Sequence, residues 1–303
     1  MITLFSNWPN LHKGWFLHSR RAVPRRIAQG TKLVINLYHV LRLRAIMLQG
    51  AQKQILIRNP IILYKFLGSY LATCFSTKNR LNILLNHYGY MDRYISDQNI
   101  CLALCNKITL WHQIREQTEY AIVLTAPAHA SFEGELVLEY RMDNLMLFRI
   151  TFTIMPGYMA GLLTEQTIFI GGSQGTANTS RQTRQAAKAN NEISPAAMLI
   201  LAVQALGKTL NITTITGVST KFHCSDSVNM NPEGYYSTYD LMWEANGGKQ
   251  HGYFFTFSNT PYEKSLELVP GNHRSRTRKK REFKLDLYAM FYAEWQQIFN
   301  KIA

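Results

Sequence analysis

The segment from Ile168 to Asn191, IFIGGSQGTANTSRQTRQAAKANN, joins an apolar run, a Gly-rich stretch and a basic helical pattern. Glycines leave backbone N–H groups unshielded, and a helix N-terminus attracts anions through such groups. The segment therefore predicts either a phosphate cradle or a tight corner that holds no ligand. The residues that would form the cradle are Gly171, Gly172, Gln174, Gly175, Arg181 and Arg184.

A pair of carboxylates offers acid–base chemistry. Glu133 and Glu135 flank Gly134 in the sequence EGEL, and alternate residues of an extended chain point to the same side. The pair predicts either a two-carboxylate site for proton transfer or a solvated strand end.

Histidines are the second group of acid–base candidates. His223, in STKFHCSD, follows a predicted strand, and His129, in APAHASFEGE, precedes the two glutamates. Asp240, in YDLMWEANGG, could orient one of these imidazoles as in a general-base pair. Alternatively, Asp240 caps a turn while Trp243 packs.

The cysteines predict neither a metal site nor a disulfide framework. The four of them lie at irregular spacing without a CxxC pair. We therefore expect reduced, mostly buried thiols and no bound metal.

Basic residues are concentrated in the first third of the chain. Residues 1–91 contain thirteen Lys or Arg and no Asp or Glu, whereas residues 92–303 contain twenty basic and nineteen acidic residues. A second basic run, RSRTRKKR, covers residues 274–281. Both are either solvated faces or contacts for something anionic, since each Lys or Arg beside an anionic lipid contributes about 1 kcal/mol.

The partner that we expect on this charge is an anionic membrane surface or lipid, or an acidic carrier protein. Nucleic acid is the weakest alternative, because the chain carries no nucleic-acid-binding motif. The opening sequence MITLFSNWPNLHKGWF lacks the features of an export signal, and the most apolar stretch, 55–75, is interrupted by Arg58, Pro60 and Lys65. We therefore expect a cytoplasmic protein, peripheral on the inner membrane where the basic third meets lipid.

Hydrophobic periodicity divides the chain into two parts. Residues 31–48, 59–75 and 76–91 have helical spacing, whereas the following part has short β-branched and aromatic runs bounded by turn formers. Strands are predicted within residues 119–127, 134–155, 167–172, 212–219 and 252–258, with a hairpin turn at 142–144 and a buried helix at 195–210. The helical crossover between the third and fourth of these runs predicts a parallel strand pair.

The expected fold is therefore α+β, with a mixed β-sheet and packed helices. We divide it into a basic helical N-terminal region, 1–91, and an α+β domain, 92–303. A last amphipathic helix, FKLDLYAMFYAEWQQIF, follows the second basic run.

The order of several motifs resembles the VirK/YbjX family of Gram-negative bacteria. The motifs are EGEL, IGGSQG, TRQAAKA, PAAMLILAVQALG, ITGVS, YDLMWEANGG and RTRKKREFKLDLYAM. The resemblance covers the chain from about Asn59 onward and implies a role in the cell envelope: surface display of a virulence protein, outer-membrane integrity and resistance to cationic antimicrobial peptides. It implies no particular reaction.

The strand, loop, helix and strand around IGGSQG are similar to the cofactor half of the GCN5-related acyltransferases. In those enzymes such a loop holds the pyrophosphate of acyl-coenzyme A. Their usual pattern is Gln or Arg, two residues, Gly, one residue, then Gly or Ala, whereas here Gly175 follows Gln174 directly. The order of strand, loop, helix and strand is thus the same as in those enzymes, but the sequence pattern of their phosphate-binding loop is not present.

Three functions remain open at this point. The first is a membrane-associated envelope factor. The second is an acyltransferase that uses acyl-coenzyme A or an acyl carrier, with IGGSQG as cradle and His223 or His129 with Asp240 as base and orienting group. The third is a nucleic-acid-binding post-transcriptional regulator.

Overall fold

The computed structural model describes residues 30–49, 52–94, 106–127, 132–224, 232–263 and 265–299. The helices are α4 (Leu37–Gln49), α5 (Lys53–Arg58), α6 (Thr77–Tyr94), α8 (Ser180–Ala189), α9 (Pro195–Thr209), α11 (Pro232–Ala245) and α12 (Arg274–Phe299). Short 3-10 helices are η1 (Pro60–Leu67), η2 (Gly157–Ala160), η3 (Thr220–Phe222), η4 (Leu266–Leu268) and η5 (Gly271–His273).

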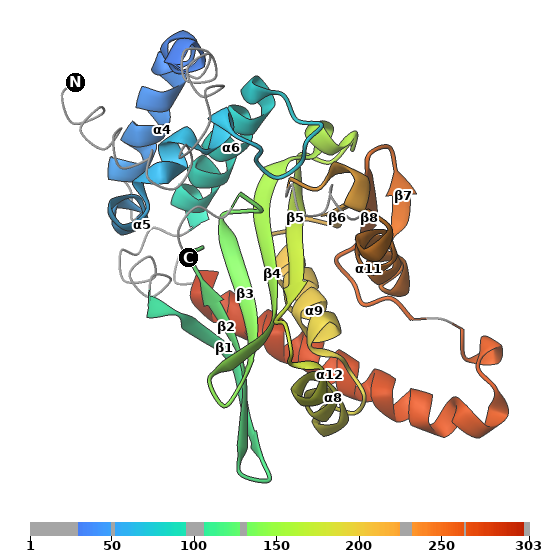
Figure 1. Cartoon of the computed structure of the whole chain (residues 1–303). Helices are drawn as coiled ribbons and strands as arrows, with labels where there is room; N and C mark the ends of the chain where they lie inside the picture. Colours follow the sequence, from blue (N-terminus) through green and yellow to red (C-terminus); the bar gives the residue numbers. More distant parts are fainter. Residues whose placement is uncertain are drawn as a thin grey trace.

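One mixed, open sheet organises the fold (Figure 1). Its strands are β1 (Ile108–Arg115), β2 (Thr118–Thr125), β3 (Leu136–Met142), β4 (Leu145–Pro156), β5 (Gln166–Gly175), β6 (Thr214–Val218), β7 (Lys249–His251) and β8 (Phe254–Ser258). The order is β1-β2-β3-β4-β5-β6-β8-β7. All neighbours are antiparallel except β5 and β6, which are parallel and joined through α8 and α9. The predicted α+β class, mixed sheet and parallel pair are confirmed.

Helices cover the sheet because its central strands are apolar on both sides. β4 and β5 are buried along most of their length. α6 packs on β4, α9 packs on β3 to β6, and α12 packs on α9. Figure 1 shows α4, α5 and α6 grouped at one end of the sheet and α11 near β8. The predicted buried helix is α9, in which every turn contributes fully buried side chains.

Local signals in the sequence explain several boundaries. The hairpin between β3 and β4 turns at Asp143 and Asn144, which both have positive φ, as a two-residue turn of this kind requires. Ser76 Oγ accepts a hydrogen bond from Asn79 N at the start of α6, as its N-cap position predicts. Ser194 does the same for Ala197 N at the start of α9.

Some predicted elements differ from the structure. The run 59–75 forms the short η1 rather than a long α-helix. The last helix, α12, begins at Arg274 and so includes the basic run 274–281, ahead of its predicted start at Phe283. β1 and β7 were not predicted. The division at residues 91 and 92 stays a prediction; both residues lie in α6, and one hydrophobic core includes side chains from Leu33 to Phe299.

Candidate active site

The double glycine of IGGSQG lies inside β5, not in a loop. Gly171 is the extra residue of a bulge, because Thr151 pairs with Gly172 and Phe152 pairs with Ile170. A Cβ at Gly171 would come within 2.2 Å of the Glu133 carbonyl oxygen, and one at Gly172 within 2.2 Å of Glu133 Oε2. The glycines therefore allow the chain around Glu133 to cross the bulge. The space that side chains at Gly171 and Gly172 would need is filled by the backbone and the side chain of Glu133, so it does not hold a ligand.

Glu133 accepts a hydrogen bond from Gln174 on β5, and Gln174 is itself bonded to Arg149 on β4. Gln174 Nε2 donates to Glu133 Oε1 at 2.9 Å, and Arg149 Nη2 donates to Gln174 Oε1 at 2.7 Å. The Glu133 side chain is 12% exposed. Burial raises the pKa of the Glu133 carboxyl, and the Arg149 charge opposes this rise. Glu133 is therefore a carboxylate whose basicity exceeds that of an ordinary glutamate.

His223 lies where β5 and β6 separate. Their parallel pairing ends at Ile170 and Gly217, and the His223 ring is hydrogen-bonded to the backbone of Gly171, just beyond that point. His223 Nε2 lies 3.6 Å from Glu133 Oε1. Burial lowers the pKa of His223 to about 4, so its imidazole is neutral at pH 7.

Tyr239 completes this cluster, although no sequence motif predicts its role. Its hydroxyl lies 3.4 Å from His223 Nε2 and accepts a hydrogen bond from Ser173 N at 3.0 Å. Tyr239 and Asp240 are neighbours in α11, so the segment YDLMWEANGG does contribute to the cluster, through a different residue. The cluster thus combines a carboxylate, an imidazole and a phenol at the carboxyl ends of a parallel strand pair.

Asp240 and Trp243 have the structural roles that formed the alternative prediction. Asp240 Oδ1 accepts hydrogen bonds from Thr220 N at 3.0 Å and Thr220 Oγ1 at 3.3 Å. Trp243 is fully buried and donates from Nε1 to Val218 O at 2.8 Å. Asp240 therefore caps the turn that leads to His223. His129 lies outside the described residues.

Glu135 has partners different from those of Glu133. Its Oε1 lies 2.8 Å from Lys65 Nζ, with both side chains fully buried, and its Oε2 accepts from the Tyr88 hydroxyl. Tyr70 lies beside this pair; burial and then the Glu135 charge raise its pKa. The two glutamates of EGEL therefore belong to separate clusters and share no proton-transfer site.

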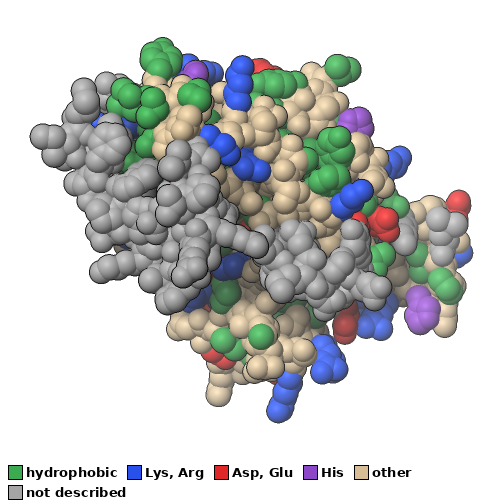
Figure 2. Space-filling model, turned by 45° about the horizontal axis from the view of Figure 1, so that its top comes forward, with side chains coloured by type: hydrophobic (Ala, Val, Ile, Leu, Met, Phe, Trp, Pro, Cys, Tyr) green, Lys and Arg blue, Asp and Glu red, His purple; other side chains and the backbone are tan. Residues whose placement is uncertain are grey.

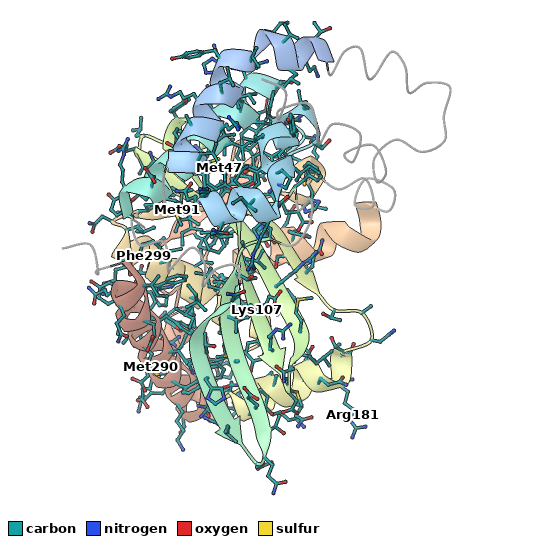
Figure 3. The ribbon with its side chains drawn as sticks, turned by 90° about the vertical axis from the view of Figure 1, so that its left-hand side faces the viewer. Met47, Met91, Lys107, Arg181, Met290 and Phe299 are labelled. Atoms are coloured by element: carbon teal, nitrogen blue, oxygen red, sulfur yellow. The ribbon has the colours of Figure 1, made fainter. Side chains whose placement is uncertain are left out.

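Arg181 and Arg184 lie away from the double glycine. Both are on α8 and line a hollow that α8 forms with the β1–β2 hairpin. Figure 3 shows the Arg181 side chain pointing outward from the end of α8. Gly175 is the last residue of β5, and a Cβ added there would meet Phe148 Cδ2 at 3.5 Å, which is an ordinary contact distance.

The described part of the chain offers neither a metal cluster nor a membrane span. Within it, no group of three or more His, Cys, Asp or Glu could hold a metal ion. None of the described helices combines the length and the apolar character needed to cross a membrane.

Comparison with known proteins places the chain in a family. A family model described as "Protein of unknown function (DUF535)" matches residues 32–289. The chain belongs to the DUF535 family.

A relative within the VirK/YbjX type of this family is the "Uncharacterized protein YbjX" of Escherichia coli (strain K12). It is 25% identical over 201 residues, which cover 64% of this chain and 59% of YbjX. The predicted family resemblance is confirmed, and YbjX is a distant homologue. No solved structure matches the chain.

Proposed function

We propose that this DUF535 protein is an acyltransferase that moves an acyl group from coenzyme A or an acyl carrier to an amine or hydroxyl of an envelope component. The observation that carries the proposal is the position of Glu133, which accepts a hydrogen bond from Gln174 and lies 3.6 Å from His223, at the edge where the pairing of β5 and β6 ends. In open α/β sheets, ligands bind outside the carboxyl ends of parallel strands beside such a crossover.

The assigned roles follow from charge and basicity. Glu133, with its raised pKa, accepts the proton of the acceptor amine or hydroxyl while that atom attacks the thioester carbonyl. The C–S bond then breaks, and the departing thiolate takes up the proton that Glu133 accepted, which restores the carboxylate. Neutral His223 and Gln174 orient the carboxylate, and the Tyr239 hydroxyl positions His223.

The layout of β5, the α8–α9 crossover and β6 supports a donor site of the GCN5-related acyltransferase kind. Because IGGSQG is strand, the cradle belongs to the segment from Gly175 to the first turn of α8. Thr179 provides no side-chain cap for that turn, which leaves N–H groups for an anion. We propose Gly175 and this turn, in place of Gly171 and Gly172, as the contact for the donor's phosphates.

The test is thiol release from acetyl-coenzyme A and from a long-chain acyl-coenzyme A, with envelope extract of a Gram-negative bacterium as acceptor. Glu133→Gln keeps the hydrogen-bonding shape and removes the base, so release should fall by about 10²-fold or more. Glu244→Gln, on an exposed position of α11, is the matched control and should retain the wild-type rate. Equal rates in Glu133→Gln and wild type would refute the assignment.

A second candidate function, a membrane-associated envelope factor, is favoured by the surface of α4. This surface, the α4 face, consists of the exposed side chains Leu37, Tyr38 and Leu41 of α4 and of Val34 and Ile35 in the helical residues just before it. Lys32 and Arg42 are also exposed along the same helical segment. Figure 2 shows hydrophobic side chains together with basic ones at the end of the molecule that carries α4. Such a mixture suits an anionic lipid surface.

Sedimentation with vesicles tests this candidate. Binding to anionic vesicles should exceed binding to neutral ones and should weaken as salt shortens the Debye length from about 10 Å at 0.1 M to about 3 Å at 1 M. The variant Ile35→Ser/Tyr38→Ser should bind less, whereas Leu163→Ser, at an exposed position elsewhere, should bind as wild type does. Equal binding to neutral and anionic vesicles would count against lipid as the partner. The two candidates are compatible if the acyl acceptor lies at the membrane.

A further inference from the structure

The hollow between α8 and the β1–β2 hairpin collects positive charge. Its cationic lining residues are Arg115, Arg181, Arg184 and Lys188, and Glu116 is the acidic one. Its volume of about 690 Å³ lies within the range of about 300–1,000 Å³ that is usual for small-molecule sites. None of the ion pairs among the described residues uses any of the four cations.

Three of the cations form a row along α8. Arg181, Arg184 and Lys188 are three and four residues apart, so their side chains are neighbours along a row about 10 Å long. Like charges at this spacing destabilise a helix, and a cation near the N-terminus opposes the helix dipole. The first turn of α8 contains no acidic residue to offset this. A bound anion would relieve this repulsion between the three exposed side chains.

The fourth cation, Arg115, lies on β1, across the hollow from α8, and its position is fixed by two contacts. Arg115 Nη1 donates to the carbonyl oxygen of Ala189 at the end of α8. Its guanidinium also lies 6.0 Å from the centre of the Phe283 ring. A cation that is already fixed loses little side-chain entropy when a ligand binds. Thr118 and Gln185 add hydrogen-bonding groups to the lining.

We propose that this hollow binds a ligand that carries phosphate groups. Arginine side chains match phosphate geometry and form charge-assisted hydrogen bonds with it. A row about 10 Å long suits two phosphates better than one. The ligand is either a soluble phosphate ester such as a nucleotide or the headgroup of a phospholipid. The hollow adjoins the proposed donor contact, because Arg181 lies in the first turn of α8. It does not require acyl transfer itself, because Glu133, His223 and Tyr239 are not among its lining residues.

The experiment is calorimetric titration of the full chain with ADP and with inorganic pyrophosphate at low salt. We expect saturable binding, weakened by about tenfold or more in Arg181→Gln/Arg184→Gln. The matched control, Arg278→Gln/Lys279→Gln, removes the same charge from exposed positions of α12 and should bind nearly as wild type does. Melting of the Arg181→Gln/Arg184→Gln variant should be unchanged or raised, because like-charge repulsion is removed. If that variant does not fold, Lys188→Gln takes its place.

Vesicles with and without phosphatidylglycerol distinguish the two sources of phosphate. Binding of ADP or pyrophosphate that depends on Arg181 and Arg184 assigns the site to a soluble ligand. Binding of phosphatidylglycerol vesicles alone, with the same dependence, assigns it to a headgroup. The proposal is overturned if none of the three probes binds, or if the α8 variant and the α12 control lose binding equally.

Discussion

The ion pair between Lys65 and Glu135 gives the sharpest stability prediction. Lys65 Nζ lies 2.8 Å from Glu135 Oε1, and neither side chain has any exposed surface. Lys65→Met keeps a similar unbranched volume but leaves the carboxylate buried without its cation. Breaking a buried pair in this way costs about 3–5 kcal/mol. We expect urea denaturation to show a loss of this size in the free energy of unfolding.

Two further variants test whether the loss of stability comes from leaving a charge buried or simply from removing an ion pair. Lys65→Met/Glu135→Gln removes both charges while the amide oxygen can still accept from Tyr88, so it should recover about 1–3 kcal/mol of the loss. Arg276→Met breaks an exposed ion pair with Glu192, 3.2 Å long and with side chains 70% and 46% exposed. That change should cost about 0–1 kcal/mol. Similar losses of stability in Lys65→Met and Arg276→Met would refute the claim that burial makes the Lys65–Glu135 pair costly to break.

Two other predictions test buried groups. Burial, with a contribution from the Lys65 charge, lowers the pKa of His87 to about 3. The neutral His87 imidazole therefore makes its full contribution to stability above about pH 6.5, and this contribution is lost as the pH falls toward the pKa of His87 in the folded protein, about 3. His87→Gln should make the fall in stability below pH 6.5 shallower, by up to about 1.4 kcal/mol per pH unit; an unchanged slope would show that His87 is protonated in the fold. Gly171→Ala should destabilise by more than about 2 kcal/mol, because its Cβ would meet a backbone oxygen of Glu133 at 2.2 Å. Gly175→Ala should be nearly neutral, and equal melting temperatures of these two variants would refute the account of the bulge.

Secondary structure was predictable where local chemistry and tertiary packing agree. Period-two alternation, the Asp143-Asn144 turn and the continuous apolar run of α9 each predicted what the structure contains. Lys65 shows where this fails. A lysine in an apolar run is expected to reach solvent, but its partner Glu135 lies 70 positions away in the sequence, and no local signal links the two.

Several members of the Glu133 cluster are sequence candidates, but their arrangement is not apparent from the sequence, and their role as a site stays a prediction. His223, Glu133 and Gln174 are all candidates on sequence grounds, and they do form one cluster. A Gly-rich stretch before a helix is typical of a loop, whereas the crossing of Glu133 over β5 is a long-range contact that no local pattern reveals. Tyr239 begins the segment YDLMWEANGG, in which the sequence singles out Asp240, so only its proximity to His223 identifies Tyr239 as a member of the cluster.

Binding of an acyl donor tests the central claim most directly. Calorimetry of the full chain with acetyl-coenzyme A and a long-chain acyl-coenzyme A should give one-site binding of at least one donor. Gly175→Val should abolish that binding with little change in melting temperature, since Gly175 has no positive φ and its Cβ position has ordinary contacts. Absence of binding of both donors to the wild-type chain would contradict the acyltransferase account.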